Sequence, residues 1–247
     1  MRLKDRVAIV TGAAGGLGKM FAIELAREGA HVAVVDVHDA EPVQKEIEAS
    51  GGKAVALFGN VTDSASMNDM ASQTKQHFGK IDILINNAAI YAGLKRCSFM
   101  DIDLEEWDRV MAVNVKGAFL AVRAVYPYMK EQQYGKIVNI ASEVFFTGSH
   151  GFAHYVTSKG GIIGLTRALA IETGPDNICI NAIAPGFTDT EASRGIADVH
   201  RYDTSKTPLQ RLCKPDDLTG TAIFLASSDS DFITGQAMIV DGGRVMH

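Results

Sequence analysis

The chain has 247 residues, of which 47% are hydrophobic and 21% charged, a composition typical of a globular protein with a full core. A net charge of −5 at pH 7 gives no basic footprint for nucleic acid or an anionic membrane, so we expect neither as a partner. No apolar run approaches the ~20 residues of a membrane span, and a predicted strand begins at Val7, which leaves no room for a signal peptide. Cys97, Cys179 and Cys213 lie far apart in no metal-like spacing. We therefore expect a reduced, cytoplasmic protein without disulfides or a bound metal.

Strand-like and helix-like segments alternate along the chain, which is typical of parallel βαβ units. The predicted strands cover residues 7–11, 31–36, 54–58, 81–87, 136–140, 178–183 and 237–240. The predicted helices begin after residue 18 and then cover 41–49, 64–77, 104–130, 154–173 and 215–226. Residues 187–212 are polar and weakly periodic, which indicates a mobile substrate-binding segment. With no linker or repeat in view, we predict one α/β domain over residues 1–247.

A glycine-rich turn joins the first predicted strand to the first helix, in the sequence Gly12-Ala-Ala-Gly-Gly-Leu-Gly18. Strand, turn and helix in this order place backbone N–H groups and a helix N-terminus where a pyrophosphate can sit. Asp36 ends the next strand, where a carboxylate accepts hydrogen bonds from adenosine ribose hydroxyls and repels a 2′-phosphate. Since no arginine or lysine follows at Val37 or His38, we predict NAD rather than NADP.

Tyr155 and Lys159 are four residues apart in a predicted helix, and therefore share one face of it. A phenol loses its proton only near pH ~10, and we expect the nearby ammonium to lower this pKa. Ser142, just past the strand 136–140, can hold an alcohol or carbonyl oxygen while the tyrosine moves its proton. The pattern predicts proton transfer at a carbon–oxygen bond, coupled to hydride transfer.

Ligands of open parallel sheets bind beyond the carboxyl ends of the strands. The polar and glycine-containing positions just described fall at such ends, together with Asn60, Asn86-Asn87 and Pro185-Gly186. Their convergence predicts a single active site.

The chain resembles the short-chain dehydrogenase/reductases along essentially its whole length. The matching motifs are Thr11–Gly18, Asn86-Asn-Ala-Ala89, Asn114, Ser142, Tyr155-x3-Lys159, Pro185-Gly186 with Thr190, and Val240-Asp-Gly-Gly243. The resemblance implies a Rossmann fold with a doubly wound, seven-stranded parallel sheet and helices on both faces. It also implies a catalytic tetrad of Asn114, Ser142, Tyr155 and Lys159. In that scheme Lys159 also contacts the nicotinamide ribose, and Asn114 holds a water in the proton relay.

The same resemblance implies a set of contacts to NAD. These are Gly12, Gly15, Gly16, Leu17, Gly18, Asp36, Val37, Asn60, Val61, Asn87, Ala88, Tyr155, Lys159, Pro185, Gly186, Thr188 and Thr190. We expect Asn87 along the adenosine-side ribose, and Thr188 and Thr190 on the carboxamide and phosphate side. The chain departs from the family pattern at Asn60, usually an aspartate that caps the adenine pocket, and at Ala89, usually a glycine.

Residues 142–146, 160–170 and 244–247 look similar to two groups within the family, the NAD-dependent 1-phenylethanol dehydrogenases and the pyridoxal 4-dehydrogenases. We therefore predict an alcohol dehydrogenase or carbonyl reductase that acts on a small, largely apolar cyclic or aromatic compound. The predicted substrate contacts are Tyr91, Ser142, Val144, Phe145, Phe152 and Tyr155. Phe145, Phe146 and Phe152 could equally fill the core, and we assign no role to Lys95-Arg96.

Two other functions stay open at this point. A 3-oxoacyl thioester reductase would need a basic residue to bind a 2′-phosphate and a basic surface to dock an acidic carrier, and the sequence shows neither clearly. A protein that senses NAD without turnover tends to lose the tyrosine or the lysine, and both are present. His150 and His154 have the spacing of a helical zinc pair, but without a third ligand they are better read as loop or pocket-wall residues.

The helix 104–130 and the Tyr155 helix carry apolar residues on more than one side, so one side of each needs a partner beyond the sheet. The resemblance implies that they pair across a two-fold axis, with a second two-fold at the last helix and strand, where the apolar tail Val245-Met246 reaches a neighbour. The prediction is a homotetramer of D₂ symmetry. The alternative is that these residues fill the core of one monomer.

Overall fold

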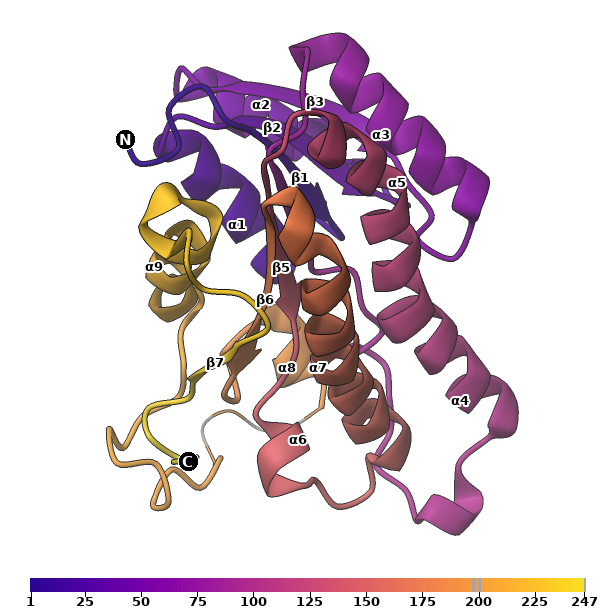
Figure 1. Ribbon diagram of the computed structural model, residues 1–247. Coiled ribbons are helices and arrows are strands. Elements are labelled where there is room, and N and C mark those ends of the chain that lie inside the picture. The colour runs from indigo at the N-terminus through magenta and orange to yellow at the C-terminus, as the bar shows by residue number, and fades with distance from the viewer. Residues whose placement is uncertain (197–198, 200, 247) are drawn as a thin grey trace.

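A single parallel sheet organises the protein, and the computed structural model describes residues 1–196, 199 and 201–246 (Figure 1). Its seven strands follow the order β3-β2-β1-β4-β5-β6-β7. Their bounds are β1 (Val7–Thr11), β2 (His31–Asp36), β3 (Lys53–Phe58), β4 (Ile83–Asn86), β5 (Gly135–Ile140), β6 (Ile178–Pro185) and β7 (Ala237–Val240). The direction of strand addition reverses between β1 and β4, and ligands of doubly wound sheets bind at such a reversal.

Helices cover both faces of this sheet. They are α1 (Gly16–Arg27), α2 (Glu41–Ala49), α3 (Ser64–Phe78), α4 (Leu104–Met111), α5 (Ala118–Glu131), α6 (Val144–Thr147), α7 (Ala153–Thr173), α8 (Glu191–Arg194) and α9 (Pro215–Ala226). Helices α1, α2 and α9 pack on one face, and α3, α5 and α7 on the other (Figure 1). The central strands are buried on both faces, which explains their mainly apolar sequences. The predicted doubly wound, seven-stranded Rossmann fold is confirmed.

The predicted helix 104–130 is one helical rod with a change of winding in its middle. Between α4 and α5 the chain forms a π-helical segment, η2 (Ala112–Gly117), and Pro127 lies inside α5. The wider turn contains Asn114, whose Oδ1 accepts a hydrogen bond from the Ile90 amide at 2.7 Å. Its Nδ2 donates to the Ile90 carbonyl and to the Ser158 hydroxyl, both at 3.1 Å. A π-turn inside an α-helix is typical of functional positions, and here it joins the rod to α7.

A chain of buried side-chain hydrogen bonds fixes α7 on the sheet. Asn86 Nδ2 donates to Asn139 Oδ1, and Asn139 Nδ2 donates to Thr166 Oγ1, each at 2.9 Å. The residues come from β4, β5 and α7 and are all buried. Because buried polar groups are costly without partners, this chain favours one position of α7 over others.

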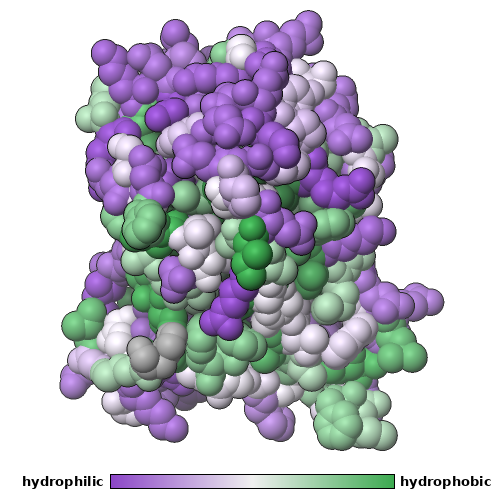
Figure 2. All heavy atoms as spheres, viewed as in Figure 1, coloured by the Kyte–Doolittle hydropathy of each residue, from purple (hydrophilic) through white to green (hydrophobic). Residues whose placement is uncertain are grey.

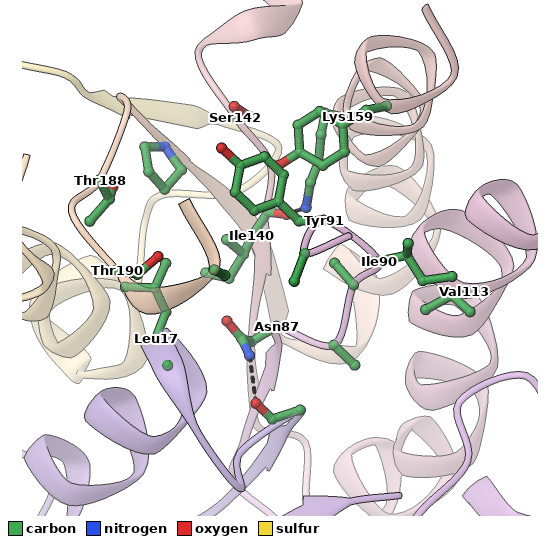
Figure 3. A pocket seen from close by; sticks show the side chains of 18 of the residues that line it. Leu17, Asn87, Ile90, Tyr91, Val113, Ile140, Ser142, Lys159, Thr188 and Thr190 are labelled. Carbon is green, nitrogen blue, oxygen red and sulfur yellow. Dashed lines mark hydrogen bonds between the residues drawn. The ribbon is translucent and has the colours of Figure 1, made fainter. Parts of the chain in front are cut away.

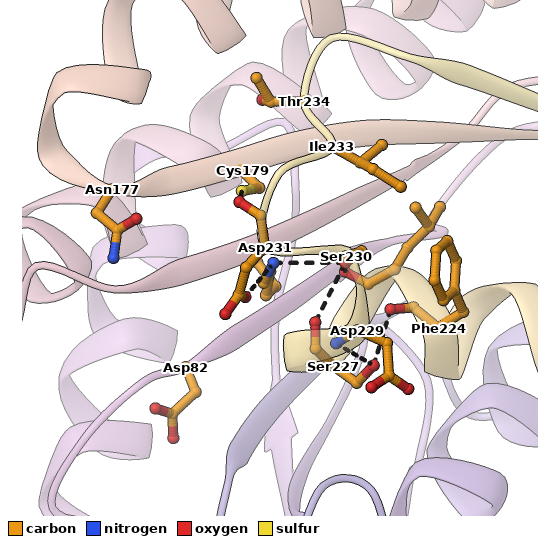
Figure 4. Close-up of polar contacts among 12 residues, drawn as sticks. Asp82, Asn177, Cys179, Phe224, Ser227, Asp229, Ser230, Asp231, Ile233 and Thr234 are labelled. Carbon is orange, nitrogen blue, oxygen red and sulfur yellow. Dashed lines mark hydrogen bonds and ion pairs between the residues drawn. The ribbon is translucent and has the colours of Figure 1, made fainter.

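At the opposite, amino end of β5, an ion pair between a buried lysine and an exposed aspartate holds the segment that follows α9. Lys136 is almost fully buried, and its Nζ lies 2.8 Å from Asp231 Oδ1 and 3.4 Å from Ser230 Oγ. Figure 4 shows Ser227, Ser230 and Asp231 in this turn, beside Cys179 of β6. The polar contacts at this end serve packing.

Two further expectations from the sequence concern membrane spans and the segment 187–212. No helix among residues 1–196, 199 and 201–246 is long and apolar enough to cross a membrane. Of the predicted mobile segment 187–212, residues 197, 198 and 200 lie outside the described residues, as does residue 247 of the tail.

Candidate active site

A cavity of about 1380 Å³ opens at the carboxyl ends of the strands. Its lining runs from the glycine turn and Asp36 to Ser142, Tyr155 and Arg244. In Figure 3, Ser142, Tyr91 and Lys159 lie together in one part of the cavity, with Asn87 and Leu17 further along it. Residues far apart in the sequence are thus brought to a single site, as the strand ends predict.

The glycine turn is built from backbone conformations that other residues rarely adopt. Gly12 and Gly16 have φ values of +64° and +55°. At Gly18, a Cβ would lie 2.1 Å from the Gly12 carbonyl oxygen and 2.6 Å from Asn87 Nδ2. Gly12, Gly15, Gly16 and Leu17 line the cavity, whereas Gly18 does not. Gly18 lies behind the turn, where it permits close packing of α1, and its contact with a cofactor stays a prediction.

The N-terminus of α1 faces open space and is suited to an anion. Its N-cap residue Gly15 has no side-chain cap, and the first turn holds no acidic residue. A Cβ at Gly15 or Gly16 would meet nothing within 4 Å. Uncapped N–H groups and the positive end of the helix dipole attract phosphate oxygens. The turn therefore fits the pyrophosphate of a nicotinamide dinucleotide.

Asp36 lines the cavity at the end of β2, next to this turn. Its Oδ2 accepts a hydrogen bond from the Ala14 amide, and its Oδ1 accepts one from the His38 amide, both at 3.0 Å. His38 Nδ1 lies 3.1 Å from the same Oδ1. The carboxylate is thus held in one orientation toward the position expected for a ribose.

The other residues predicted around the adenosine also border this end of the cavity, namely Val37, Asn60, Val61, Asn87 and Ala88. Asn60 Oδ1 accepts hydrogen bonds from the Thr62 amide at 3.1 Å and its hydroxyl at 2.8 Å, which fixes the loop after β3. Asn87 Nδ2 donates to the carbonyls of Thr11 at 3.1 Å and Gly12 at 2.9 Å. Asn87 therefore ties the glycine turn to the end of β4.

Ser142, Tyr155 and Lys159 meet in the middle of the cavity lining. The Tyr155 hydroxyl is hydrogen-bonded to Ser142. Lys159 Nζ donates to the Ile140 carbonyl at 2.7 Å and lies 5.6 Å from the Tyr155 ring centroid. Asn114 is buried behind this group and does not border the cavity, so it contacts the site through Ile90 and Ser158.

Burial controls the ionisation of both titratable groups. It raises the pKa of Tyr155, an effect that the hydrogen bond to Ser142 only partly offsets. It also lowers the pKa of Lys159 to about 8. The expectation that the ammonium lowers the tyrosine pKa is wrong for this structure, because removal of the phenolate from water, together with the neighbouring Tyr91, raises the pKa by more than the hydrogen bond to Ser142 lowers it.

The remaining predicted cofactor residues, Pro185, Gly186, Thr188 and Thr190, line the cavity after β6. Thr188 Oγ1 donates to the Gly186 carbonyl at 2.8 Å. Thr190 caps α8, with its Oγ1 accepting a hydrogen bond from the Ser193 amide at 3.2 Å. These local bonds fix the shape of the loop after β6 where it borders the cavity.

An aromatic wall borders the catalytic group. The ring centroids of Tyr91 and Tyr155 are 5.0 Å apart, and the Phe152 ring lies 6.5 Å from the first and 5.9 Å from the second. Val144 also lines this part of the cavity. We call the region bordered by Tyr91, Ser142, Phe152 and Tyr155 the substrate end.

Phe145 does not belong to this wall, and its contact with a substrate stays a prediction. Its side chain is 42% exposed and lies outside the cavity lining. Its ring covers Gly160 of α7, where a Cβ would come within 2.8 Å, and Phe146 meets it edge-on at 5.0 Å. The short helix α6 directs both rings toward α7.

The structure adds cavity residues that sequence reasoning missed, among them Arg96, Phe187, Tyr202 and Arg244. Phe187 and Tyr202 stack at 4.3 Å, nearly parallel. These residues belong to loops and the tail, and no motif or spacing unites them. His150 lines the cavity, but His154 is fully buried with its Nε2 3.2 Å from Glu106 Oε1. Across the described chain, no three His, Cys, Asp or Glu side chains gather as a metal site.

Comparisons with known proteins agree with this architecture. A family model described as "Enoyl-(Acyl carrier protein) reductase" matches residues 12–244. A crystal structure titled as a short-chain type dehydrogenase/reductase from Mycobacterium marinum superposes with a TM-score of 0.92 at 35% identity, covering 99% of this chain and 97% of that one. The chain belongs to the short-chain dehydrogenase/reductase family, whose members are oxidoreductases that use nicotinamide cofactors.

Two curated relatives indicate the range of chemistry among similar chains. One is the (2S)-[(R)-hydroxy(phenyl)methyl]succinyl-CoA dehydrogenase subunit BbsD of Thauera aromatica, 39% identical over 99% of this chain and 98% of its own. The other is a 3-oxoacyl-[acyl-carrier-protein] reductase of Thermotoga maritima, 38% identical over the full length of both chains.

The lowered pKa of Lys159 predicts a pH-dependent cost to stability. Below a pH of about 8 the folded protein bears the full cost of a buried ammonium. Between about 8 and the ordinary value of 10.5 the unfolded chain binds more protons than the folded one, so this cost falls as pH rises. The stability of Lys159→Met relative to the parent should therefore be greatest near pH ~7 and decline toward pH ~10.

Urea unfolding at several pH values measures this difference. Lys95→Met, at an exposed position one residue from Arg96, is the control and should give a flat profile. A Lys159→Met difference that does not vary over this pH range would contradict the prediction.

Proposed function

We propose that the protein is an NAD-dependent alcohol dehydrogenase or carbonyl reductase. It transfers a hydride between NAD and the hydroxyl or carbonyl carbon of a small, largely apolar cyclic or aromatic compound. The observation that carries this proposal is one continuous cavity with Asp36 and the open end of α1 on one side and Ser142, Tyr155 and an aromatic wall on the other. Burial of a ring against such a wall is worth on the order of 1.5–3 kcal/mol, which favours compact rings over short linear alcohols.

The residues divide the proton chemistry among them. Bound nicotinamide supplies the hydride acceptor for alcohol oxidation and the hydride donor for carbonyl reduction. The Ser142 hydroxyl holds the substrate oxygen, and Tyr155 accepts its proton in oxidation or returns it in reduction. In this proposal, as the family resemblance implies, Lys159 contacts the nicotinamide ribose and Asn114 holds a water in the proton relay. Oxidation thus removes one hydride from carbon and one proton from oxygen.

A 3-oxoacyl thioester reductase is the second candidate, and the Thermotoga relative favours it by name. The Thauera relative is named for a substrate that joins a phenyl carbinol to a thioester. The aromatic wall of Tyr91, Phe152 and Tyr155 supports the ring compound as the first choice. Comparing kcat/KM for 1-phenylethanol and for a 3-hydroxyacyl thioester separates the two, and absence of NADH formation with either leaves the NAD-sensing alternative.

The three cysteines are all unpaired, which supports our proposal that the protein works in the reducing cytoplasm.

Replacement of Tyr155 tests the catalytic assignment. Tyr155→Phe should lower kcat by ~10²–10⁴-fold, the range typical of general acid–base groups, while NAD affinity measured by calorimetry stays nearly constant. Alcohol oxidation by the parent should rise with pH, since only the phenolate accepts a proton and burial raises its pKa. Tyr128→Phe, on α5 outside the cavity lining, is the control. Near-normal turnover of Tyr155→Phe would overturn the assignment.

Cofactor choice tests the role of Asp36. The parent should prefer NAD, because the Asp36 carboxylate accepts hydrogen bonds from the ribose hydroxyls and repels a 2′-phosphate. Asp36→Ala combined with Val37→Arg should shift the NADP-to-NAD ratio of kcat/KM by about ten- to hundredfold, the worth of one charge-assisted hydrogen bond. Val37→Arg alone keeps the repelling carboxylate and should shift the ratio less. Equal use of both cofactors by the parent would refute this role.

We also propose a homotetramer. Large apolar side chains remain exposed on the chain, including Phe99, Leu104, Ile171 and Phe232. Figure 2 shows hydrophobic residues spread over the lower half of one face, around α6 and the C-terminal end, while the upper half is mostly hydrophilic. Exposed apolar area of this kind favours association.

Light scattering should report four times the 26.5 kDa chain mass at micromolar concentration. Leu104→Glu combined with Ile171→Glu should reduce the mass, because each places a charge on an exposed apolar position. A single-chain mass for the parent would contradict the assembly.

A further inference from the structure

Two arginines border the substrate end of the cavity in addition to Lys159. Arg96 comes from the loop after β4, and Arg244 from the tail after β7. The proposed function uses neither. An apolar alcohol would give these cations nothing to bind, so their placement bears on what the substrate carries.

Arg96 is held in place by three contacts and has no carboxylate partner among the described residues. Its NH1 donates to Ser149 Oγ at 2.9 Å and to the His150 carbonyl at 2.6 Å. Its guanidinium lies 4.5 Å from the ring centroid of Phe152, a member of the aromatic wall. A cation is therefore oriented against the surface on which the substrate ring would lie.

Arg244 is incompletely satisfied. Its Nε lies 3.9 Å from Glu143 Oε2, too far for a hydrogen bond. Its NH1 is buried and finds no hydrogen-bond partner within the described part of the chain. Burial raises the pKa of Glu143, and Asp203, the other carboxylate that the charge of Arg244 reaches, forms no ion pair with it among the described residues. Buried donors are nearly always bonded, so an orphaned one indicates a missing acceptor.

Tyr202 links the two arginines. The Arg244 guanidinium lies 5.7 Å from its ring centroid. The positive charges of Arg244 and Arg96 both lower the pKa of Tyr202, whereas burial raises it. Both guanidinium groups therefore lie near the Tyr202 hydroxyl. Tyr202 stacks on Phe187, so the two cations converge on one ordered aromatic pair.

We propose that the substrate carries a carboxylate, bound between Arg96 and Arg244, while its ring lies on Phe152 and Tyr91 and its carbinol meets Ser142 and Tyr155. This inference rests on the proposed function and narrows its substrate to a ring alcohol or ketone with an acidic group. A guanidinium presents paired N–H donors that match the two oxygens of a carboxylate. A phosphate on a pantetheine arm offers similar oxygens, and the experiment separates the two sources.

The test compares 1-(4-carboxyphenyl)ethanol and its 3-carboxy isomer with their neutral methyl esters. The parent should favour at least one carboxylate over its ester by about ten- to hundredfold in kcat/KM, the range for hydrogen bonds to charged groups. Most of this preference should appear as a lower KM for the carboxylate rather than as a higher kcat, because the carboxylate is remote from the reacting carbon. Arg96→Gln and Arg244→Gln should each move the carboxylate-to-ester ratio toward one, and Arg244→Lys should retain part of it. Lys95→Gln removes a charge beside Arg96 but outside the cavity lining, and should leave the ratio unchanged.

Calorimetry with the corresponding keto acids and NAD, a pair that cannot exchange a hydride, gives a second readout, in which the two Gln variants should bind each keto acid about tenfold or more weakly than the parent. Equal kcat/KM for acid and ester in the parent, or a preference that survives both Gln variants, would overturn the subsite while leaving the dehydrogenase proposal intact. A preference for 3-hydroxybutyryl phosphopantetheine over its dephosphorylated form, without one for the carboxylates, would overturn the carboxylate assignment. If no ring alcohol, acid or ester, is oxidised, the proposed function itself fails.

Discussion

The structure depends on one constraint: a parallel sheet covered on both faces keeps water and ligands away from the middle of its strands. β1, β4, β5 and β6 are buried throughout. Polar side chains of the site are therefore placed where the strands end and the backbone turns away from the core. The reversal of strand order between β1 and β4 opens the cavity at this edge, and every predicted catalytic residue lies in its lining or directly behind it.

The same burial that stabilises the fold sets the electrostatics of the site. It raises the pKa of Tyr155 and lowers that of Lys159 to about 8, so it shifts each group toward its neutral form, although Lys159 keeps its proton below that pH. The hydrogen bond from Lys159 to the Ile140 carbonyl and the bond between Tyr155 and Ser142 satisfy the two groups within the protein. The site is thus preorganised by packing, and its ionisation is open to control by charges that a ligand brings.

The π-helical turn and the buried asparagines show how distant elements are kept in register. Asn114 connects the loop after β4 to Ser158 of α7, and Asn139 connects β5 to the same helix. Both bonds restrain α7, which carries Tyr155 and Lys159. Positioning of the catalytic group is therefore distributed over three elements, and neither asparagine borders the cavity.

Local patterns in the sequence were sufficient for the fold and for most of the lining. Strand runs, the glycine turn, Asp36 and the Tyr155–Lys159 pair are short-range features whose geometry follows from backbone chemistry within a few residues. The π-turn at Asn114, the packing of Phe145 and Phe146 against α7 and the approach of Arg96 and Arg244 to one cavity were decided only by the tertiary structure. Packing between segments far apart in the chain sets these features. The pKa of Tyr155 was also decided by the tertiary structure: the sequence predicts a lowered value, whereas burial, a property of the assembled core, raises it.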